Sequence, residues 1–486
     1  MEGAAPRSVN YSDTLPLAIA STQNRRQFFP QNGQVFTDTG SNIVRIDVNA
    51  DGLLDVQQSY LEFTLGNLAP SIRSLDQGHV WIKRLTIESA GVILEDINNY
   101  NRLVSGILQP AQGSAAYMGE VQLSQGGASQ NVSFTGDAGV AGAAPLAYGD
   151  PSFSNRLPAL VDNVGANAAV PDASLVNGTN VLAAAGAGAG AVGGTFTGQY
   201  HLACGLLNMD KYLPLVLMGQ GFTIQLELAS GAEIGVMAGG AVAGVNSYQI
   251  TNVRYVAHIV DLQRDFYDML RNLQVASGGS LMIGSSTFRH FTHTFAPAGG
   301  QVENINISAR VRSLENLFFV GNRAANLINQ DVYSLSTGSN MGLSGGSWNV
   351  FIGSVRYPTN QVSVNGITNK GESYQELRKC FGALGSINHG GLLNATTYLS
   401  SVDGDDATGA SADRGQNPAY APFGISFKSW RHELEDGIDT SSRALPCRLE
   451  LTCGGGAGAG NTQVDIFAQA TILFYINMDG SVSASV

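Results

Sequence analysis

The chain has 486 residues, which is long for one hydrophobic core, because single domains rarely exceed about 250 to 300 residues. Charged residues make up only 13% of it, against about 25% in ordinary soluble domains, and the formal net charge is −12. We therefore expect two large domains whose surfaces are partly covered by other subunits. The negative balance argues against a surface that neutralises nucleic-acid phosphates.

The cysteines and the N-terminal residues give little sign of covalent cross-linking or targeting. The four cysteines are far apart and form no CxxC pair, so neither a disulfide framework nor a cysteine zinc site is expected. The first ten residues lack a basic segment followed by an apolar one, and no stretch approaches 18 apolar residues. We expect neither a secretion signal nor a membrane span.

Strand patterns dominate the sequence. Short segments rich in β-branched and aromatic residues, bounded by Gly, Asn or Asp, occur in both halves. They are residues 43–48 (IVRIDV), 59–65 (SYLEFTL), 80–87 (VWIKRLTI), 222–228 (FTIQLEL), 305–311 (INISARV), 348–355 (WNVFIGSV) and 471–476 (TILFYI). The chain is expected to be all-β.

Helical patterns are few, and one of them suggests a domain boundary. Residues 96–108 and 261–273 each place apolar side chains at spacings of three and four, which predicts an amphipathic helix. The second is followed by residues 276–280 (ASGGS), a flexible composition. We predict that one domain ends here, at about residue 275, and that the next begins at 276.

The two halves repeat the same order of elements. The strand at 80–87, a turn, a short strand and a helix are matched by the strand at 348–355, a turn, a short strand and a helix at 372–384. Farther along, the tripeptide at 226–228 (LEL), a Gly-rich loop and a strand at 253–260 recur as residues 449–451 (LEL), another Gly-rich loop and the strand at 471–476. A duplicated β module of about 220 residues accounts for both series.

Long loops separate the paired elements. Residues 110–199 are rich in Gly, Ala, Ser and Asn, and residues 392–422 are a shorter counterpart. Loops of this length in a compact domain usually project from it or carry function. Residues 188–193 match the GxGxxG pattern, but they open no helix that could hold a pyrophosphate, so we interpret them as low-complexity loop.

No group of residues predicts catalysis or metal binding. His290 and His293 have the wrong spacing for one face of a strand and lack nearby carboxylates or thiols, so buried or interface roles are favoured. Residues 403–406 (DGDD) lack the closing Glu of a calcium loop, and residues 433–436 (ELED) are more typical of an interface or turn. No nucleophile–base pattern is present. We therefore predict no catalytic residues, no cofactor, no metal and no enzyme activity.

Three segments together resemble a known family. They are residues 59–65, residues 82–108 (IKRLTIESAGVILEDINNYNRLVSGIL) and residues 465–480 (DIFAQATILFYINMDG). They resemble the double jelly-roll major capsid proteins of polinton-like viruses, virophages and related icosahedral double-stranded DNA viruses. The resemblance implies two tandem eight-stranded antiparallel jelly rolls that stand upright in a virus shell, with three chains forming a pseudo-hexagonal capsomer.

The resemblance also implies a layout for the chain. Residues 1–29 would be an N-terminal arm at the inner base of the shell, residues 30–275 the first jelly roll with a tower insertion at about 110–199, and residues 276–486 the second jelly roll. The partners would be further copies of the chain as a homotrimer, neighbouring capsomers, and the penton and minor capsid proteins of the same virion. No sequence-specific nucleic-acid partner is expected. Arg25 and Arg26 of the arm are predicted to contact a neighbouring protein rather than DNA, since two arginines neutralise few phosphates.

The alternative is a carbohydrate-binding or receptor-binding jelly-roll protein of a viral surface. Such a protein would show a metal triad or an aromatic platform. Two of the three tryptophans, Trp81 and Trp348, instead fall in the paired strands, where a structural role is expected. The sequence therefore favours the shell protein.

Overall fold

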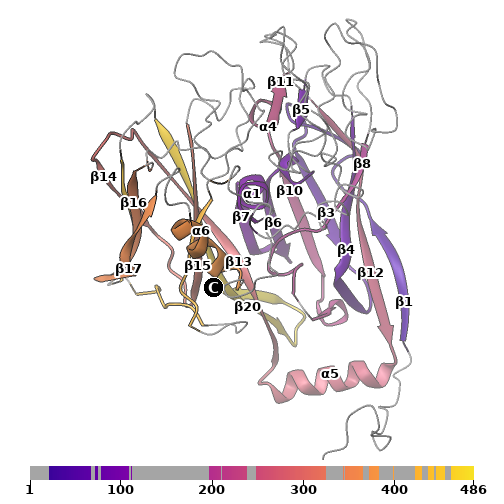
Figure 1. Ribbon diagram of the computed structural model, residues 1–486. Coiled ribbons are helices and arrows are strands. Elements are labelled where there is room, and N and C mark those ends of the chain that lie inside the picture. The colour runs from indigo at the N-terminus through magenta and orange to yellow at the C-terminus, as the bar shows by residue number, and fades with distance from the viewer. Residues whose placement is uncertain are drawn as a thin grey trace, which may run out of the picture.

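In the described part of the chain, four large antiparallel sheets stand side by side as upright layers in this computed structural model (Figure 1). The structure describes residues 21–66, 72–74, 78–108, 111, 196–209, 211–237, 248–323, 343, 345–364, 371–382, 398, 422–429, 436–442, 445–454 and 461–486. Two of the large sheets and a two-stranded sheet lie before the helix α5 (Arg264–Ala276), and the other two large sheets lie after it. Among the described residues, no sheet contains strands from both sides of this helix.

The first sandwich contains two main sheets. The outer sheet has the order β1 (Ser21–Phe28), β12 (Gln249–Leu262), β4 (Leu53–Gly66) and β8 (Phe196–Tyr200), with β2 (Val35–Thr37) and β9 (Leu213–Pro214) paired at its margins. The facing sheet has the order β3 (Ile43–Val48), β10 (Phe222–Leu228), β6 (Ile82–Ser89) and β7 (Val92–Asn98). In β10, buried and half-buried residues alternate, as expected for a strand with one face on a core.

Shorter elements complete this sandwich. They are β5 (Ile72–Ser74) paired with β11 (Gly235–Met237), the short α-helices α4 (Gly231–Ile234) and α1 (Tyr100–Leu103), the 3-10 helices η2 (Gly78–Trp81) and η6 (Leu215–Leu217), and the π-helix η3 (Val104–Leu108). α1 and η3 continue directly from the end of β7 and are buried. This position places them between the two sandwiches (Figure 1).

The second sandwich repeats the arrangement of the first. One sheet has the order β13 (Ser280–Phe295), β20 (Thr462–Asn477), β15 (Leu314–Arg323) and β18 (Phe423–Ser426), with β21 (Val482–Ser485) on β20. The other has the order β14 (Val302–Ile307), β19 (Cys447–Thr452), β16 (Gly346–Ile352) and β17 (Val355–Val364). The helix α6 (Gly371–Cys380) follows β17 and packs on β18.

Both sandwiches have the strand order of a jelly roll. Numbering the eight principal strands of each sandwich along the chain gives the sheet orders 1-8-3-6 and 2-7-4-5 in both halves. The chain is therefore a double jelly roll, and β1, β12 and β7 of the first roll correspond to β13, β20 and β17 of the second. The repeat seen in the sequence is a repeat of topology.

Each roll has an aromatic centre between its two sheets. In the second roll, Phe319 of β15 lies edge-on to Trp348 of β16 at 5.2 Å and stacks on Phe423 of β18 at 5.1 Å. In the first roll, Phe63 of β4 stacks on Tyr200 of β8 at 4.6 Å. All of these side chains are at most 1% exposed, and burying an aromatic side chain contributes about 1.5–3 kcal/mol.

Two boundaries predicted from the sequence are wrong. The segment 1–29 was expected to be an arm, but Ser21–Phe28 forms β1, which pairs with β12 along its whole length and opens the first roll. The segment 96–108 was expected to be one helix. Its first residues instead finish β7, and the helix begins at Tyr100, because the apolar residues around Ile97 pair with β6.

Other elements agree with the sequence. The strands expected at 43–48 and 222–228 have those bounds, and the others overlap observed strands. The helix expected at 261–273 is α5, three residues farther along, and the one expected at 372–384 is α6. The tower segments at 110–199 and 392–422, with the GxGxxG and DGDD patterns inside them, lie almost wholly outside the described residues, as do residues 1–20.

Candidate functional site: a buried junction between the two rolls

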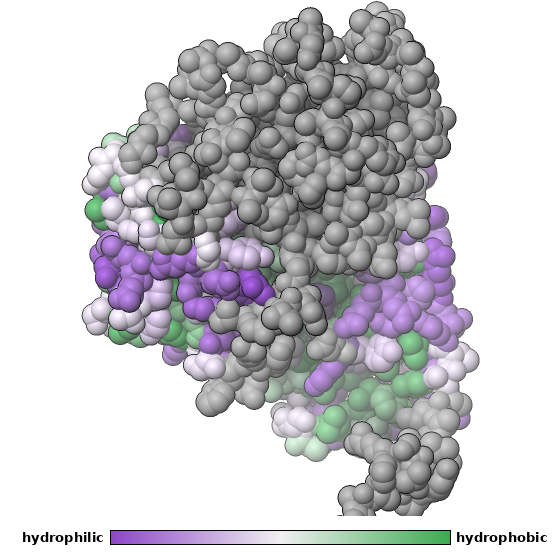
Figure 2. Space-filling view, in the orientation of Figure 1, coloured by the Kyte–Doolittle hydropathy of each residue, from purple (hydrophilic) through white to green (hydrophobic). Residues whose placement is uncertain are grey.

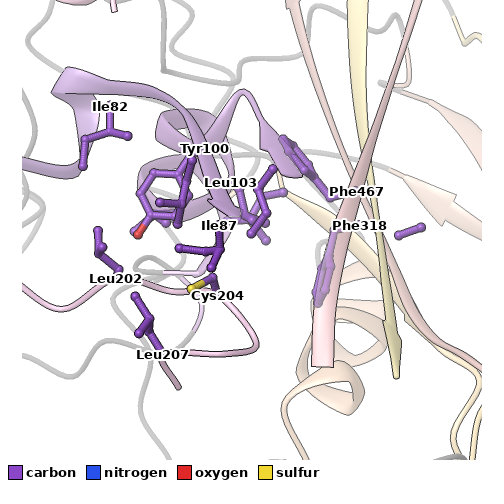
Figure 3. Packing of buried hydrophobic residues seen from close by; sticks show 14 of the residues in the cluster. Ile82, Ile87, Tyr100, Leu103, Leu202, Cys204, Leu207, Phe318 and Phe467 are labelled. Carbon is purple, nitrogen blue, oxygen red and sulfur yellow. The ribbon is translucent and has the colours of Figure 1, made fainter. Parts of the chain in front are cut away.

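The two jelly rolls meet on the outer face of the sheet that contains β20 and β15. Phe318 and Phe467 are paired neighbours in this sheet, and they point away from the core side defined by Phe319. An outward position would expose Phe467 in an isolated roll, yet it is fully buried. Phe318 is also fully buried, and it stacks at 5.4 Å on Phe381, which follows α6 of its own roll. Phe318 and Phe467 belong to the same cluster of buried residues as Tyr100 and Leu103 of α1 (Figure 3). The first roll therefore covers the part of this outer face near β13 and β20, and α6 of the second roll covers the part near β18.

A buried carboxylate lies at the centre of this junction. Asp465 of β20 is 0% exposed and accepts hydrogen bonds from side chains of both rolls. Arg102 of α1 donates through Nη1 to Oδ2 at 2.6 Å, and Asn99 donates to Oδ1 at 3.2 Å. From the second roll, His290 of β13 lies 2.9 Å from Oδ1, and Gln463 donates at 3.0 Å. The carboxylate thus ties α1 of one roll to β13 and β20 of the other.

The electrostatics of the junction depend on this pairing. Burial alone would raise the pKa of Asp465, but Arg102 and His290 outweigh it and hold this pKa well below its ordinary value. Burial opposes the charge of Arg102, whereas Asp465 and Glu233 raise its pKa. Glu233 of α4 lies 3.5 Å from Arg102 and 2.5 Å from Lys83. Two carboxylates and two cations therefore balance one another across the boundary.

A second buried carboxylate braces the loop after β8. Glu95 of β7 accepts hydrogen bonds from the backbone N–H groups of Gly205 at 2.8 Å and Leu206 at 2.7 Å. Burial raises the pKa of Glu95, and hydrogen bonds from Thr287 of the second roll and from this loop oppose the shift only in part. Burial, followed by the proximity of Glu95, also raises the pKa of the Cys204 thiol, which keeps it protonated and unreactive.

Gly205 lies where the loop after β8 approaches the second roll closely. A Cβ atom at this position would lie 3.0 Å from the carbonyl oxygen of Ser286 and 3.1 Å from Cγ2 of Ile472, both in the second roll, and 2.9 Å from Oε1 of Glu95. Only glycine leaves room for this contact without displacing a neighbour.

The base of the molecule supplies further contacts. Gln274 of α5 is buried and donates to the carbonyl oxygen of Ile476 at 2.8 Å. The backbone N–H of Gly219 donates to the carbonyl oxygen of Gly480 at 2.9 Å, which joins the first roll to the β20–β21 turn. The junction is therefore held at its centre and at its base.

Candidate residues from the sequence have structural roles where they are described. His290 lies in the junction, and His293 lies 2.8 Å from Glu303 of β14. The four cysteines, all within the described residues, form no disulfide. Arg25 donates to the Tyr60 hydroxyl at 2.8 Å from the outer side of β1. Of residues 433–436, only Asp436 is described.

Within the described ranges, no three His, Cys, Asp or Glu residues are grouped as a metal site would require. No helix in the described part of the chain has both the length and the apolar composition needed to cross a bilayer. The chemistry that the junction itself supports is ion pairing and hydrogen bonding between two sandwiches, which fixes their mutual orientation.

Sequence reasoning missed Asp465 and Arg102. A signal was present for Asp465, which stands between Val464 and Ile466 in a long apolar strand. Charged residues are almost never fully buried unless paired, so this position indicates a partner. Arg102 gave no such signal, because it lies opposite the apolar stripe of residues 96–108, where a solvated arginine is expected. The two residues are 363 positions apart, and their pairing follows only from the fold.

Comparisons of the fold identify similar structures. The mavirus major capsid protein matches with a TM-score of 0.54 and 9% identity, covering 100% of this chain and 95% of that one. The Faustovirus major capsid protein matches with a TM-score of 0.54 and 9% identity, covering 95% and 91%. The PBCV-1 virus capsid matches with a TM-score of 0.53 and 10% identity, covering 98% and 99%.

No family model and no curated protein sequence matches this chain. The chain shares the double jelly-roll fold of these viral capsid proteins along nearly its whole length.

Proposed function

We propose that this chain is a major capsid protein, the subunit from which an icosahedral virus shell is built. The observation that carries the proposal is the double jelly roll itself, which is shared over nearly the full length with the capsid proteins of mavirus and Faustovirus. The protein would act in the virion, as a structural component without catalytic activity.

The duplication explains how such a chain would tile a shell. Three chains with two similar rolls each present six similar units, so a three-fold trimer approximates a hexagon and can fill a near-hexagonal lattice. This requires the two rolls to keep one orientation, and the buried Asp465–Arg102 pair at 2.6 Å supplies the constraint. The domains of the proposal are a first roll that ends at about residue 275 and a second that covers 276–486.

The partners follow from this role. The chain would associate with itself, with neighbouring capsomers and with the penton and minor proteins of the same shell, without reading nucleic-acid sequence. Trp81 and Trp348 are at most 2% exposed, so neither contributes to the aromatic platform that a carbohydrate-binding protein would need.

Light scattering and negative-stain imaging of the purified protein test the proposal. We expect a trimer in solution, and hexagonal particles or shells in the images. A monodisperse monomer at micromolar concentration, with no particles in the images, would count against a shell subunit.

A further inference from the structure

The helix α5 leaves part of its apolar side uncovered. Its apolar residues recur at spacings of three and four between Phe266 and Leu273, which gives one stripe along the helix. Leu270 of this stripe packs partly against the core, and Gln274, one turn farther on, is buried. Met269 and Leu273, by contrast, are each more than half exposed. The rolls therefore cover one margin of the stripe and leave the other in solvent.

A further apolar side chain lies at the end of α5. The backbone N–H of Met478, in the β20–β21 turn, donates to the carbonyl oxygen of Gly279 at 3.1 Å, and the Met478 side chain is more than half exposed. We call Met269, Leu273 and Met478 the base patch. Figure 2 shows hydrophobic residues gathered in the lower part of the molecule, where Figure 1 places α5. Exposed apolar side chains that lie together are typical of a surface that binds another segment, protein or lipid.

The described part of the chain begins next to α5. Ser21, the first residue of β1, pairs with Leu262 at the end of β12, and α5 begins only two residues farther along, at Arg264. Figure 1 shows the lower ends of β1 and β12 together beside one end of α5. Residue 20 is bonded to Ser21, so the twenty residues before β1 are attached next to the first turn of α5.

One segment of these twenty residues is apolar. Residues 15–20 (LPLAIA) contain no charge, and large apolar side chains recur at every second position, Leu15, Leu17 and Ile19. In an extended chain this spacing places the three side chains on one side. Six extended residues reach about 20 Å, whereas the stripe on α5 extends over about 10 Å. The segment can therefore reach along the whole stripe from its point of attachment.

The charges on α5 favour an uncharged occupant of the base patch. The exposed charged residues of the helix are two cations and two anions, which cancel: Arg264, Arg271, Asp265 and Asp268. Amphipathic helices that bind anionic membranes are rich in Lys and Arg on the polar face, and α5 has no such excess. A short uncharged segment attached beside the helix is a better match, because binding within one chain is favoured by a high effective concentration.

We propose that residues 15–20 pack on the base patch of their own chain and cover the apolar stripe of α5. The side chains of Leu15, Leu17 and Ile19 supply the apolar surface that faces the helix. The segment keeps free chains from associating through α5, because it removes exposed apolar surface from water. The proposal concerns the single chain and does not rest on the capsid function.

Thiol labelling of the full chain tests whether the patch is covered. Met269→Cys places a thiol in the patch, and Asn272→Cys is the matched control on the exposed polar side of the same helix. Peptide mass spectrometry reads out the labelling of each position by a maleimide. We expect position 269 to react at least about tenfold more slowly than position 272. Equal rates at the two positions would overturn the proposal.

Charges placed in the segment should uncover the patch. Leu17→Asp with Ile19→Asp, added to Met269→Cys, should abolish the slow labelling of position 269, because the new carboxylates would lose their water on the helix. Ser8→Asp with Asn10→Asp adds the same charge outside the segment and should leave the labelling slow. Circular dichroism establishes that each variant is folded. If the two pairs of substitutions have the same effect on labelling, residues 15–20 are not the cover.

Disulfide trapping identifies the occupant of the patch. Under mild oxidation, Leu17→Cys with Met269→Cys should form a disulfide within one chain, whereas Leu17→Cys with Asn272→Cys should not. Covalent dimers from the first pair on a non-reducing gel would place the segment on a second copy and overturn the assignment to the same chain. If the first pair oxidises no faster than the second, the proposal is wrong, and flotation with phosphatidylcholine vesicles then shows whether the patch binds lipid instead.

Discussion

Replacing Arg102 by methionine tests whether the buried ion pair holds the two rolls together. The Arg102 side chain is 4% exposed and Asp465 is 0% exposed, so the substitution leaves a carboxylate in a site from which water is excluded. Removing one partner of a buried pair costs about 3–5 kcal/mol. Asp465 keeps His290, Asn99 and Gln463 as hydrogen-bond partners, so we expect the lower end of this range, about 3 kcal/mol.

Equilibrium urea unfolding of the full chain, followed by tryptophan fluorescence, measures the loss. The double variant Arg102→Met with Asp465→Asn removes both charges, and we expect it to lose less than the sum of the two single variants, by about 1–3 kcal/mol. Arg271→Met on the exposed side of α5 is the control and should change stability by less than about 0.5 kcal/mol. A loss below about 1 kcal/mol for Arg102→Met, or strict additivity in the double variant, would refute the coupling of the rolls through this pair.

Three further predictions concern packing, pH and DNA. Gly205→Ala should destabilise the chain by about 1–3 kcal/mol in urea unfolding, because its Cβ would press on Glu95 and on the second roll, whereas Gly106→Ala, with nothing within 4 Å, should be neutral or stabilising. Because its pKa is lowered in the folded protein, ionised Asp465 stabilises the fold at pH values above the ordinary carboxyl pKa of about 4. The loss of unfolding free energy caused by Asp465→Asn should therefore shrink as the pH falls below that value. The raised pKa of Glu95 has the opposite effect: Glu95 stabilises the fold fully below a pH of about 4, and this stabilisation is lost as the pH rises. The free energy of unfolding of Glu95→Gln should therefore increase relative to that of the unmodified chain as the pH rises. With a net charge of −12, the protein should bind duplex DNA weakly, and moderate salt should abolish this binding.

Each of these has an outcome that contradicts it. Equal stabilities for the two glycine variants would mean that the rolls are not closely packed at Gly205. The assigned pKa shifts would be wrong if the stability lost in Asp465→Asn grew as the pH fell. They would also be wrong if the stability of Glu95→Gln relative to the unmodified chain decreased as the pH rose. Tight DNA binding that persists in moderate salt would require a cationic surface that the described residues do not explain.

The sequence by itself determined the elements whose side chains alternate between core and solvent. The strands at 43–48 and 222–228 were predicted with their observed bounds because each has one buried face. Such a strand alternates between apolar and polar residues, and this alternation is visible in the sequence. The sequence also determined the duplication, since each roll must rebuild the same sandwich from its own strands and turns.

Tertiary structure decided what local patterns do not encode. β1 carries no apolar alternation because both of its faces are exposed, and it is a strand only through its hydrogen bonds with β12. Apolar residues around Ile97 fit a helical stripe equally well, and pairing with β6 made them a strand. The junction depends on Asp465 and Arg102, which come together from positions 363 residues apart. A buried charge is tolerated only when an opposite charge is buried beside it. For Asp465 this opposite charge is Arg102, which reaches it only when one complete roll packs on the other.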